Sequence, residues 1–197
     1  MSRTVHLIGN GDNATMYKPS KGIKVTCNIP PFEVANVYTT CLVDFKMMKA
    51  MTEGSVTIPG EWTLGYRPKV WMQNNPNFYM QVAQHIKGFY LDLPDYVANY
   101  TDFNCGHMAT HYSANALGAD EIHMYGFDSI FDFNLRSCTD MYLNSDRSLT
   151  NNNRLANNWR PVWENLFKEF PNTQFILYHD HSDAKIKLGE NVEVIVK

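Results

Sequence analysis

The stretch NCGHMATHYSANALGADEIHMYGFD, residues 104–128, decides the fold that this sequence predicts. In its first half a turn of small residues opens a helix predicted over residues 106–117, and Gly118 suits the position just past a helix end. In its second half an apolar strand, Glu121–Tyr125, ends in Gly-Phe-Asp. A helix followed directly by a continuous apolar strand is typical of folds in which helices pack on a parallel sheet.

Other short apolar runs extend the same pattern toward both ends of the chain. Several are continuous β-branched or aromatic runs rather than alternating ones, which indicates strands buried on both faces of a parallel sheet. The further strands are predicted at residues 4–9, 22–27, 40–45, 69–72, 173–178 and 192–196.

Helices predicted between these runs complete an alternating order of strands and helices. They cover residues 46–52, 77–86 and 158–170 in addition to 106–117. Pro161 is tolerated only in a first turn, so the regular part of the last helix is predicted to begin near Arg160. We therefore expect a single Rossmann-like α/β domain over residues 1–197, with a mostly parallel sheet and helices on both faces.

The segment of residues 134–153 fits neither a strand nor a helix and ends in the polar run LTNNN. A stretch of this length inside a compact domain is either a functional lid or disordered. Phe131, Phe133 and Tyr142 lie in or beside it, where aromatic rings either stack on a base or sugar or pin the loop to the body. We predict a long lid-like loop over a ligand site.

Composition places the chain among ordinary soluble domains, with 44% hydrophobic and 19% charged residues. It holds no apolar run near the roughly 20 residues of a membrane span, and its start lacks a signal-peptide pattern. Its four cysteines are widely spaced and form no CxxC pair, which favours a reduced, cytoplasmic protein. The net charge of -3 argues against nucleic acid as a partner and leaves a homo-oligomer open.

Four polar segments are predicted to meet at one edge of the sheet, namely residues 9–13, Asn28, residues 104–106 and residues 126–128, and three of them are strand ends. The first is VHLIGNGDNAT, residues 5–15, where a strand runs into a glycine-rich turn. Backbone N–H groups of such a turn bind anions, although the same glycines also suit a plain tight turn. The motif is neither the GxGxxG fingerprint nor a P-loop, so both interpretations stay open.

The second strand end is Asn28 in VTCNIPP, and the third is Asp128. An Asn at the carboxyl edge of a sheet can bond a ribose or phosphate, or form an Asx-turn with its own backbone. Asp128 can take a sugar hydroxyl, a metal or a proton, or it can cap the next turn. Their place at the sheet edge favours ligand contact for both residues.

These motifs, in this order and spacing, resemble the sialyltransferase superfamily and the related hydroxymethylpterin pyrophosphokinase-like proteins of archaea. The resemblance covers roughly the first two thirds of the chain, and EIHMYGF is its most specific piece. It implies a Rossmann-type fold and a cytidine monophosphate sugar as donor, bound without an obligatory metal. Carried over position by position, it implies that the donor is contacted by Gly9, Asn10, Gly11, Asn28, Cys105, Gly106, Gly126, Phe127 and Asp128.

The chain departs from that family at two places. Sialyltransferases carry a catalytic histidine between the Gly-Phe strand and the last long helix, whereas residues 129–158 contain none. Cys105 stands where the family has a hydroxyl residue. In the region of the missing histidine the polar candidates are Asp140, Tyr142, Asp146 and Arg147, of which Tyr142 or Arg147 would stabilise a leaving phosphate.

The remaining histidines offer two further constellations. His107 and His111 stand four apart on one predicted helix, a spacing that can bind zinc, but without an HExxH pattern ordinary packing is favoured. His179 and His181 follow a predicted strand, where they act as base or phosphate ligand or lie in a solvated loop. We assign no metal ligands, and we select Asp128, Tyr142 and His179 as candidate catalytic residues.

The predicted function is a nucleotide- or nucleotide-sugar-binding, glycosyltransferase-like transferase, in a chain that would suit a phage or other accessory gene. The predicted nucleotide-binding residues are Gly9, Asn10, Gly11, Asp12, Asn13, Asn28, Asn104, Cys105, Gly106, Gly126 and Phe127. One alternative is phosphoryl transfer or nucleotide hydrolysis with a divalent metal on Asp12, Asp44 or Asp128. The other is a binding protein that sequesters a nucleotide without turning it over. No cofactor is firmly implied beyond the nucleotide ligand, and a divalent metal is compatible with the sequence.

Overall fold

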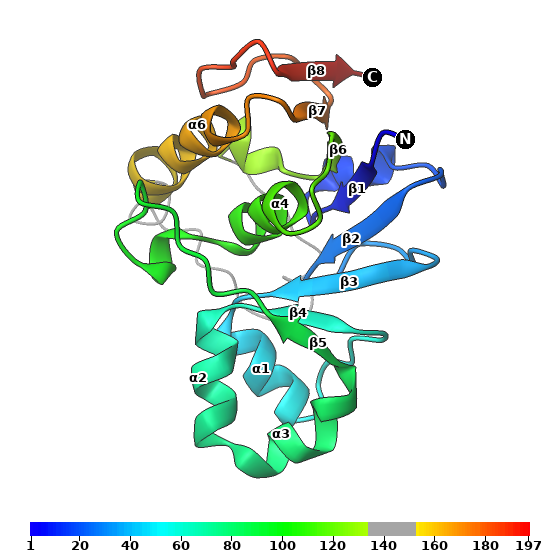
Figure 1. The fold of residues 1–197 in the computed structure, drawn as a ribbon, viewed down its shortest axis with the longest axis vertical. Coiled ribbons are helices and arrows are strands. Elements are labelled where there is room, and N and C mark those ends of the chain that lie inside the picture. The colour runs from blue at the N-terminus through cyan, green and yellow to red at the C-terminus, as the bar shows by residue number, and fades with distance from the viewer. Residues whose placement is uncertain (134–152) are drawn as a thin grey trace.

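The computed structural model describes residues 1–133 and 153–197, which form a single α/β domain. Eight strands lie in one sheet in the order β5-β4-β3-β2-β1-β6-β7-β8, and each neighbouring pair is parallel (Figure 1). The strands are β1 (Thr4–Ile8), β2 (Ile23–Cys27), β3 (Val37–Leu42), β4 (Trp62–Leu64), β5 (Ile86–Phe89), β6 (Glu121–Tyr125), β7 (Gln174–His179) and β8 (Val192–Val196). The predicted fold class is confirmed.

Helices and short helical turns connect the strands. The α-helices are α1 (Phe45–Thr52), α2 (Tyr66–Asn74), α3 (Pro76–Val82), α4 (Cys105–Asn115) and α6 (Arg160–Glu169). The short turns are η1 (Asp12–Met16), η2 (Ala83–His85), η3 (Tyr100–Asp102), η4 (Asp128–Ile130) and the π-helical turn η6 (Leu155–Trp159). Within the part of the chain that is described, no helix is both long and apolar enough to cross a membrane.

The two faces of the sheet are buried by different helices. Neighbouring side chains of a strand point to opposite faces. On β3, Cys41 packs in a core cluster with Met108 of α4, whereas Leu42 packs in a second cluster with Met48 of α1 and Met72 of α2. Figure 1 accordingly shows α1, α2 and α3 gathered beside β4 and β5, with α4 and α6 over the other strands.

The strand order reverses between β1 and β6. From β1 the chain builds outward to the edge strand β5, and α4 then carries it back so that β6 pairs with the other side of β1. From β6 it continues outward in the opposite direction to β7 and β8. Such a switch point leaves the ends of two adjacent strands with connections that depart to opposite sides, and it is where open α/β sheets bind ligands.

Helix α4 illustrates how local sequence sets an element boundary. The side chain of Asn104 accepts a hydrogen bond from the His107 N–H (3.0 Å), and the Asn104 N–H donates to His107 Nδ1 (3.1 Å), which forms a capping box. His107 Nε2 lies 3.1 Å from the carbonyl oxygen of Trp159. Complete burial lowers the pKa of His107 to about 3, although that carbonyl raises it, so the ring is neutral at physiological pH.

His107 and His111 therefore serve packing in the described structure. His111 Nδ1 lies 2.6 Å from the hydroxyl of Tyr90, and its Nε2 lies 3.1 Å from both carboxylate oxygens of Glu169. Each ring thus has its own partners on other elements. The prediction of ordinary helix packing for this pair accounts for both histidines.

Several predicted elements were wrong or shifted. Residues 69–72, predicted as a strand, belong to α2, where Pro68 and Met72 face inward four residues apart. The strand predicted at 40–45 is β3, and it ends earlier because Asp44 caps α1 by accepting from the Lys46 N–H (2.9 Å). The helix predicted at 77–86 ends sooner, and its last residue begins β5.

The start of α6 confirms the sequence prediction. The regular helix begins at Arg160 with Pro161 in its first turn, after a π-helical turn. The predicted lid, residues 134–153, falls outside the described residues except for its last position. The same holds for Asp140, Tyr142, Asp146 and Arg147, whose predicted roles stay predictions.

Candidate functional site

Polar side chains from four strand ends gather at the switch point between β1 and β6. They come from the turns after β1, β2, β6 and β7, which are neighbours in the sheet. We refer to them as the switch-point cluster, which consists of Asn10, Asn13, Asn28, Asp128, Asp132, His179, Asp180 and His181.

The glycines of this region are required by close packing of two chain segments. The N–H of Gly9 donates to the carbonyl of Tyr125 (2.7 Å), and that of Gly11 to the carbonyl of Gly126 (3.0 Å). A Cβ on Gly9 would lie 2.8 Å from the Gly126 carbonyl oxygen, and a Cβ on Gly11 would lie 2.5 Å from the Asp128 carboxylate. The tight-turn interpretation therefore explains both glycines. The N–H groups of Gly9 and Gly11 already have backbone partners, so they are not available to a nucleotide phosphate in this arrangement. Contact of these glycines with a nucleotide stays a prediction.

Asn10 ties the turn after β1 to the end of β2. With its amide oriented to satisfy its surroundings, Asn10 Nδ2 donates to the carbonyls of Cys27 (2.6 Å) and Ile29 (2.7 Å). Its Oδ1 then accepts from Asn28 Nδ2 (3.3 Å). Asn10, in the glycine-rich turn after β1, thus positions Asn28 at the end of β2.

Asn28 has an unusual backbone and an unpaired acceptor. Its φ is 51°, in the left-handed region that Asn tolerates better than most residues, and its N–H donates to the Cys41 carbonyl (3.1 Å). Among the described residues its buried Oδ1 has no hydrogen-bond partner. An unpaired buried acceptor costs about 1–3 kcal/mol, so this oxygen is suited to accept from a ligand. The Asx-turn alternative would have paired this atom.

Asp128 links the turn after β1 to the end of β6. It is only 8% exposed, and its Oδ1 accepts from Asn13 Nδ2 (3.1 Å) while its Oδ2 accepts from the Asn13 N–H (3.4 Å). Burial raises the pKa of Asp128, although the hydrogen bonds from Asn13 oppose the shift. Its carboxylate therefore bonds across the fold instead of capping its own turn.

His179 stands at the centre of the cluster. The ring is 1% exposed and stacks on Phe131 with centroids 3.9 Å apart. Its Nδ1 lies 3.0 Å from Asn13 Nδ2 and 3.5 Å from Asp128 Oδ1. Two predicted catalytic residues, Asp128 and His179, are thus brought together, although they are far apart in the sequence.

Asp132 and His181 extend the cluster on the other side of the His179 ring. His179 Nε2 lies 3.0 Å from Asp132 Oδ2 and 3.3 Å from His181 Nε2, which in turn lies 2.9 Å from Asp132 Oδ1. Partial burial raises the pKa of Asp132, but hydrogen bonds from His181 and His179 outweigh it and lower the pKa. We did not predict Asp132 as a site residue from the sequence. Its position one short turn after Asp128 could have indicated that it lies at the same strand end.

Asn104, Cys105, Gly106 and Phe127 occupy a different environment from the switch-point cluster. Asn104 caps α4, the Cys105 thiol donates to the Cys41 carbonyl (3.0 Å), and a Cβ on Gly106 would lie 3.0 Å from the Phe127 ring. Phe127 packs edge-on against Trp163. All four make core or capping contacts, and their predicted nucleotide contacts are not tested.

The buried thiols of Cys27 and Cys41 are unreactive. The Cys27 thiol lies 3.9 Å from the Cys105 carbonyl oxygen. A hydrogen bond with Cys105, together with burial, raises the pKa of Cys27 well above its usual value, and burial does the same for Cys41. These thiols stay protonated at neutral pH and are poor nucleophiles.

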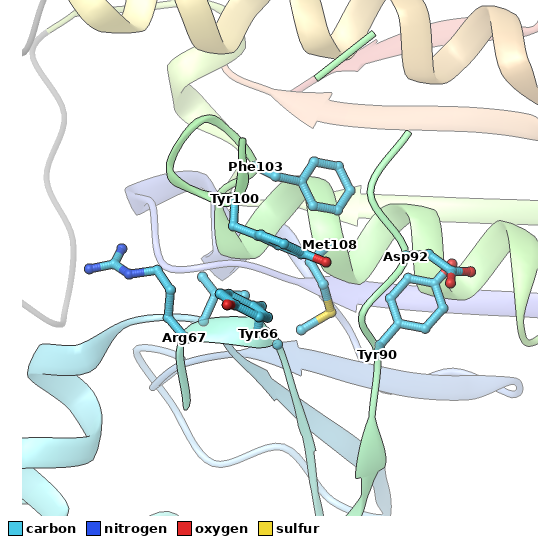
Figure 2. A pocket seen from close by; sticks show the side chains of 9 residues that line it. Tyr66, Arg67, Tyr90, Asp92, Tyr100, Phe103 and Met108 are labelled. Carbon is cyan, nitrogen blue, oxygen red and sulfur yellow. The ribbon is translucent and has the colours of Figure 1, made fainter. Parts of the chain in front are cut away.

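A small pocket lies at the same sheet edge, beside β3, β4 and β5. We refer to it as the edge pocket, which is lined by Val43, Gly65, Tyr66, Arg67, Tyr90, Asp92, Tyr100, Phe103 and Met108. Figure 2 shows the rings of Tyr66 and Tyr100 stacked face to face in its centre, with centroids 4.3 Å apart. None of the predicted site residues lines it, because β4 and β5 were not predicted as strands.

Comparisons of the chain with protein-family models, with curated proteins and with solved structures find no match. The resemblance to sialyltransferases therefore rests on the quoted motifs. The structure itself shows an α/β fold with an eight-stranded parallel sheet in the order given above.

Proposed function

We propose that the chain binds a nucleotide or nucleotide sugar at the switch-point cluster and is a glycosyltransferase-like transferase that uses a cytidine monophosphate sugar as donor. The observation that carries the proposal is a pair of contacts at four neighbouring strand ends, Asn10 with Asn28 and Asp128 with His179. Strand ends on both sides of a switch point form the usual ligand site of open α/β sheets.

The unpaired Oδ1 of Asn28 indicates what kind of group the ligand presents. A buried acceptor requires a donor, such as the exocyclic amine of cytosine or a ribose hydroxyl. Uracil carries a carbonyl where cytosine carries the amine, so a base at this position would be discriminated by one hydrogen bond. We therefore expect cytidine nucleotides to bind more tightly than uridine nucleotides.

Asp128 and His179 supply the proposed acid–base chemistry. Asp128 and Asn13 hold the Nδ1 side of the His179 ring, which leaves Nε2 on the opposite side. In glycosyl transfer the acceptor oxygen bonds to the anomeric carbon and the carbon–oxygen bond to the nucleotide breaks. Nε2 takes the acceptor proton once its hydrogen bond to Asp132 (3.0 Å) has opened and the ring proton stands on Nδ1 beside Asp128. Tyr142, the third candidate, lies outside the described residues and stays a prediction for the leaving phosphate.

Nucleotide binding to Asn28→Gly tests the proposal. Glycine keeps the left-handed backbone and removes only the amide, and Asn36→Gly is a matched control because Asn36 also has a positive φ (57°) in an exposed turn. We expect cytidine monophosphate to raise the melting temperature of the wild type and of Asn36→Gly, and to bind Asn28→Gly more weakly. Absence of any nucleotide effect at millimolar concentration, or equal binding by both variants, contradicts the proposal.

A second candidate function is metal-dependent phosphoryl transfer or nucleotide hydrolysis. The His and Asp side chains after β7 favour it, since they can hold a cation beside Asp128. Asp44 does not contribute, because it caps α1. Loss of nucleotide turnover on treatment with a chelator would favour this candidate over glycosyl transfer, and binding without turnover would favour a sequestering protein.

A further inference from the structure

We infer that His179, His181 and Asp132, with Asp180 at its rim, form a binding site for one divalent transition-metal ion. The four side chains each offer a ligand atom, and these atoms lie within 4.8 Å of one another. From the sequence we assigned no metal ligands, and Asp12, Asp44 and Asp128, which were considered for a divalent cation, are not among these four side chains. The site uses His179 Nε2, the proposed base of glycosyl transfer, so the inference bears on the proposed function, but its test needs no nucleotide.

The distances between the ligand atoms fit a single ion. Zinc–nitrogen and zinc–oxygen bonds are about 2.0–2.2 Å, so neighbouring ligand atoms around one ion are about 2.8–3.1 Å apart in octahedral and about 3.3–3.6 Å apart in tetrahedral geometry. His179 Nε2 and His181 Nε2 are 3.3 Å apart, and Asp132 Oδ2 is 3.0 Å from each. Asp180 Oδ1 is 3.0 Å from His179 Nε2.

The surrounding structure holds these groups in place. Arg160 donates to the carbonyls of Ser129 (2.9 Å) and Asp132 (3.1 Å), and the Lys185 N–H donates to the carbonyl of Ile130 (2.9 Å). The bond of Lys185 joins the segment after β6 to the loop that follows β7. The backbone of Asp132 is therefore held by a contact that does not involve its side chain, and the loop that carries His181 is tied to the same segment.

The Nδ1 side of the His179 ring faces Asn13 Nδ2 at 3.0 Å and Asp128 Oδ1 at 3.5 Å. Coordination of an ion at Nε2 places the ring proton on Nδ1, where the Asp128 carboxylate replaces Asn13 as its hydrogen-bond partner. In front of the ring, the side chains of His181 and Asp132 are 38% and 42% exposed, which gives an ion access from solvent.

The ligand types indicate the class of ion. Two imidazole nitrogens with carboxylate oxygens suit zinc, iron, cobalt or manganese, whereas magnesium and calcium prefer sites made only of oxygen. Asp132 and Asp180 together balance the charge of a divalent ion.

Metal binding competes with a hydrogen-bonded arrangement of the same residues. In that arrangement both Nε2–H groups donate to Asp132, and the Asp183 N–H donates to His181 Nδ1 (3.2 Å). Coordination at His181 Nε2 moves the proton to Nδ1, which releases the Asp183 bond. A bound ion also occupies the Nε2 lone pair of His179, so the metal-bound form belongs with the phosphoryl-transfer candidate.

Titration of the untagged, chelator-treated full chain with Co²⁺ and Zn²⁺ tests the inference without any nucleotide. We expect one equivalent of Co²⁺ to bind with visible absorption bands of a nitrogen–oxygen site, and Zn²⁺ to displace it. His181→Ala, a partly exposed position, is expected to lower the affinity at least about tenfold, and Asp128→Asn to lower it roughly 10–100-fold as a residue that orients a ligand.

His85→Ala is the matched control, because this histidine contacts the Gly60 carbonyl and lies outside the cluster. It is expected to bind Co²⁺ as the wild type does, and melting curves without metal check that every variant is folded. Failure of the folded wild type to bind one equivalent overturns the inference, as does unchanged affinity in His181→Ala. Neither result bears on nucleotide binding, which is measured separately.

Discussion

The switch-point cluster and the edge pocket occupy the same carboxyl edge of one sheet, yet they are built from opposite chemistry. The cluster consists of Asn, Asp and His side chains that follow directly after β1, β2, β6 and β7. The edge pocket contains the aromatic rings of Tyr66, Tyr90, Tyr100 and Phe103, of which the last three come from the long connection between β5 and α4 (Figure 2). The difference shows that sheet position alone does not determine a site.

The physical reason lies in the connections. At the switch point the chain leaves β1 and β6 toward opposite sides, so their polar ends meet. Beside β3, β4 and β5 the connection to α4 returns across the strand ends, and Phe103 and Tyr100 fill the space. Such aromatic packing stabilises the fold, whereas the polar cluster retains hydrogen-bonding capacity.

The largest expected effect distinguishes the two regions by stability. Phe103 is 4% exposed and packs on His107 and His111. We expect Phe103→Ala to lower the free energy of unfolding by about 3–5 kcal/mol, measured by urea denaturation, because it leaves a cavity beside α4. If the edge pocket is a scaffold, Co²⁺ affinity of the folded fraction stays unchanged, and a parallel loss of affinity would couple the two regions.

Gly126→Ala addresses the packing beneath the switch-point cluster. Gly126 has a φ of 78°, and its added Cβ would lie 2.7 Å from the Cβ of Ala14. The left-handed backbone costs about 1–2 kcal/mol and the overlap about as much again, so we expect a loss of about 3 kcal/mol.

Gly54→Ala is the control for that substitution. Gly54 has nearly the same φ (75°) but nothing within 4 Å of an added Cβ. It should show the backbone cost alone, so the difference between the two variants measures the contact between the β1 turn and β6. Equal losses in both variants would mean that this contact is loose.

The two aspartates of the cluster should give opposite pH dependences of stability. Burial raises the pKa of Asp128 in the folded chain, so its contribution is favourable at low pH and declines as the pH rises from about 3.9, its unfolded value, through the folded pKa. The pKa of Asp132 is lowered by its histidine partners, despite partial burial, so its contribution is present above about 3.9 and is lost as the pH falls through the folded pKa.

Urea denaturation of Asp128→Asn and Asp132→Asn across acid pH measures these contributions. Relative to the wild type, Asp132→Asn should lose stability mainly above the unfolded pKa, whereas Asp128→Asn should gain relative stability as the pH rises. Identical pH profiles of the two variants would show that the carboxylates titrate as one unit.

The smallest expected effect concerns the exposed ring of the edge pocket. Tyr66 is 43% exposed and stacks on Tyr100. We expect Tyr66→Ala to cost about 0.5–1.5 kcal/mol, the usual value of an aromatic pair beyond burial, by thermal or urea denaturation. A cost as large as that of Phe103→Ala would place this ring in the core of the domain.

Much of the fold could be predicted because local sequence patterns, such as apolar runs and the position of a proline, indicate its elements. The bounds of β6 and β8 and the start of α6 at Arg160 follow from continuous apolar runs and from a proline that only a first turn accepts. The three-residue β4 and four-residue β5 were missed, since segments this short acquire strand structure by pairing with neighbours rather than from their own pattern.

Part of the candidate site could likewise be predicted from local patterns, and part could not. The sequence alone predicts an α/β chain and places Asn28, Asp128 and His179 as polar residues at strand ends. Only the tertiary structure placed Asp132 against His179 and His181 and showed that the thiol of Cys105 bonds within the core. It also showed that Asn28 Oδ1 has no hydrogen-bond partner among the residues that are described. Residue spacing encodes helix and strand periodicity, whereas the order of strands in the sheet decides which of their ends meet.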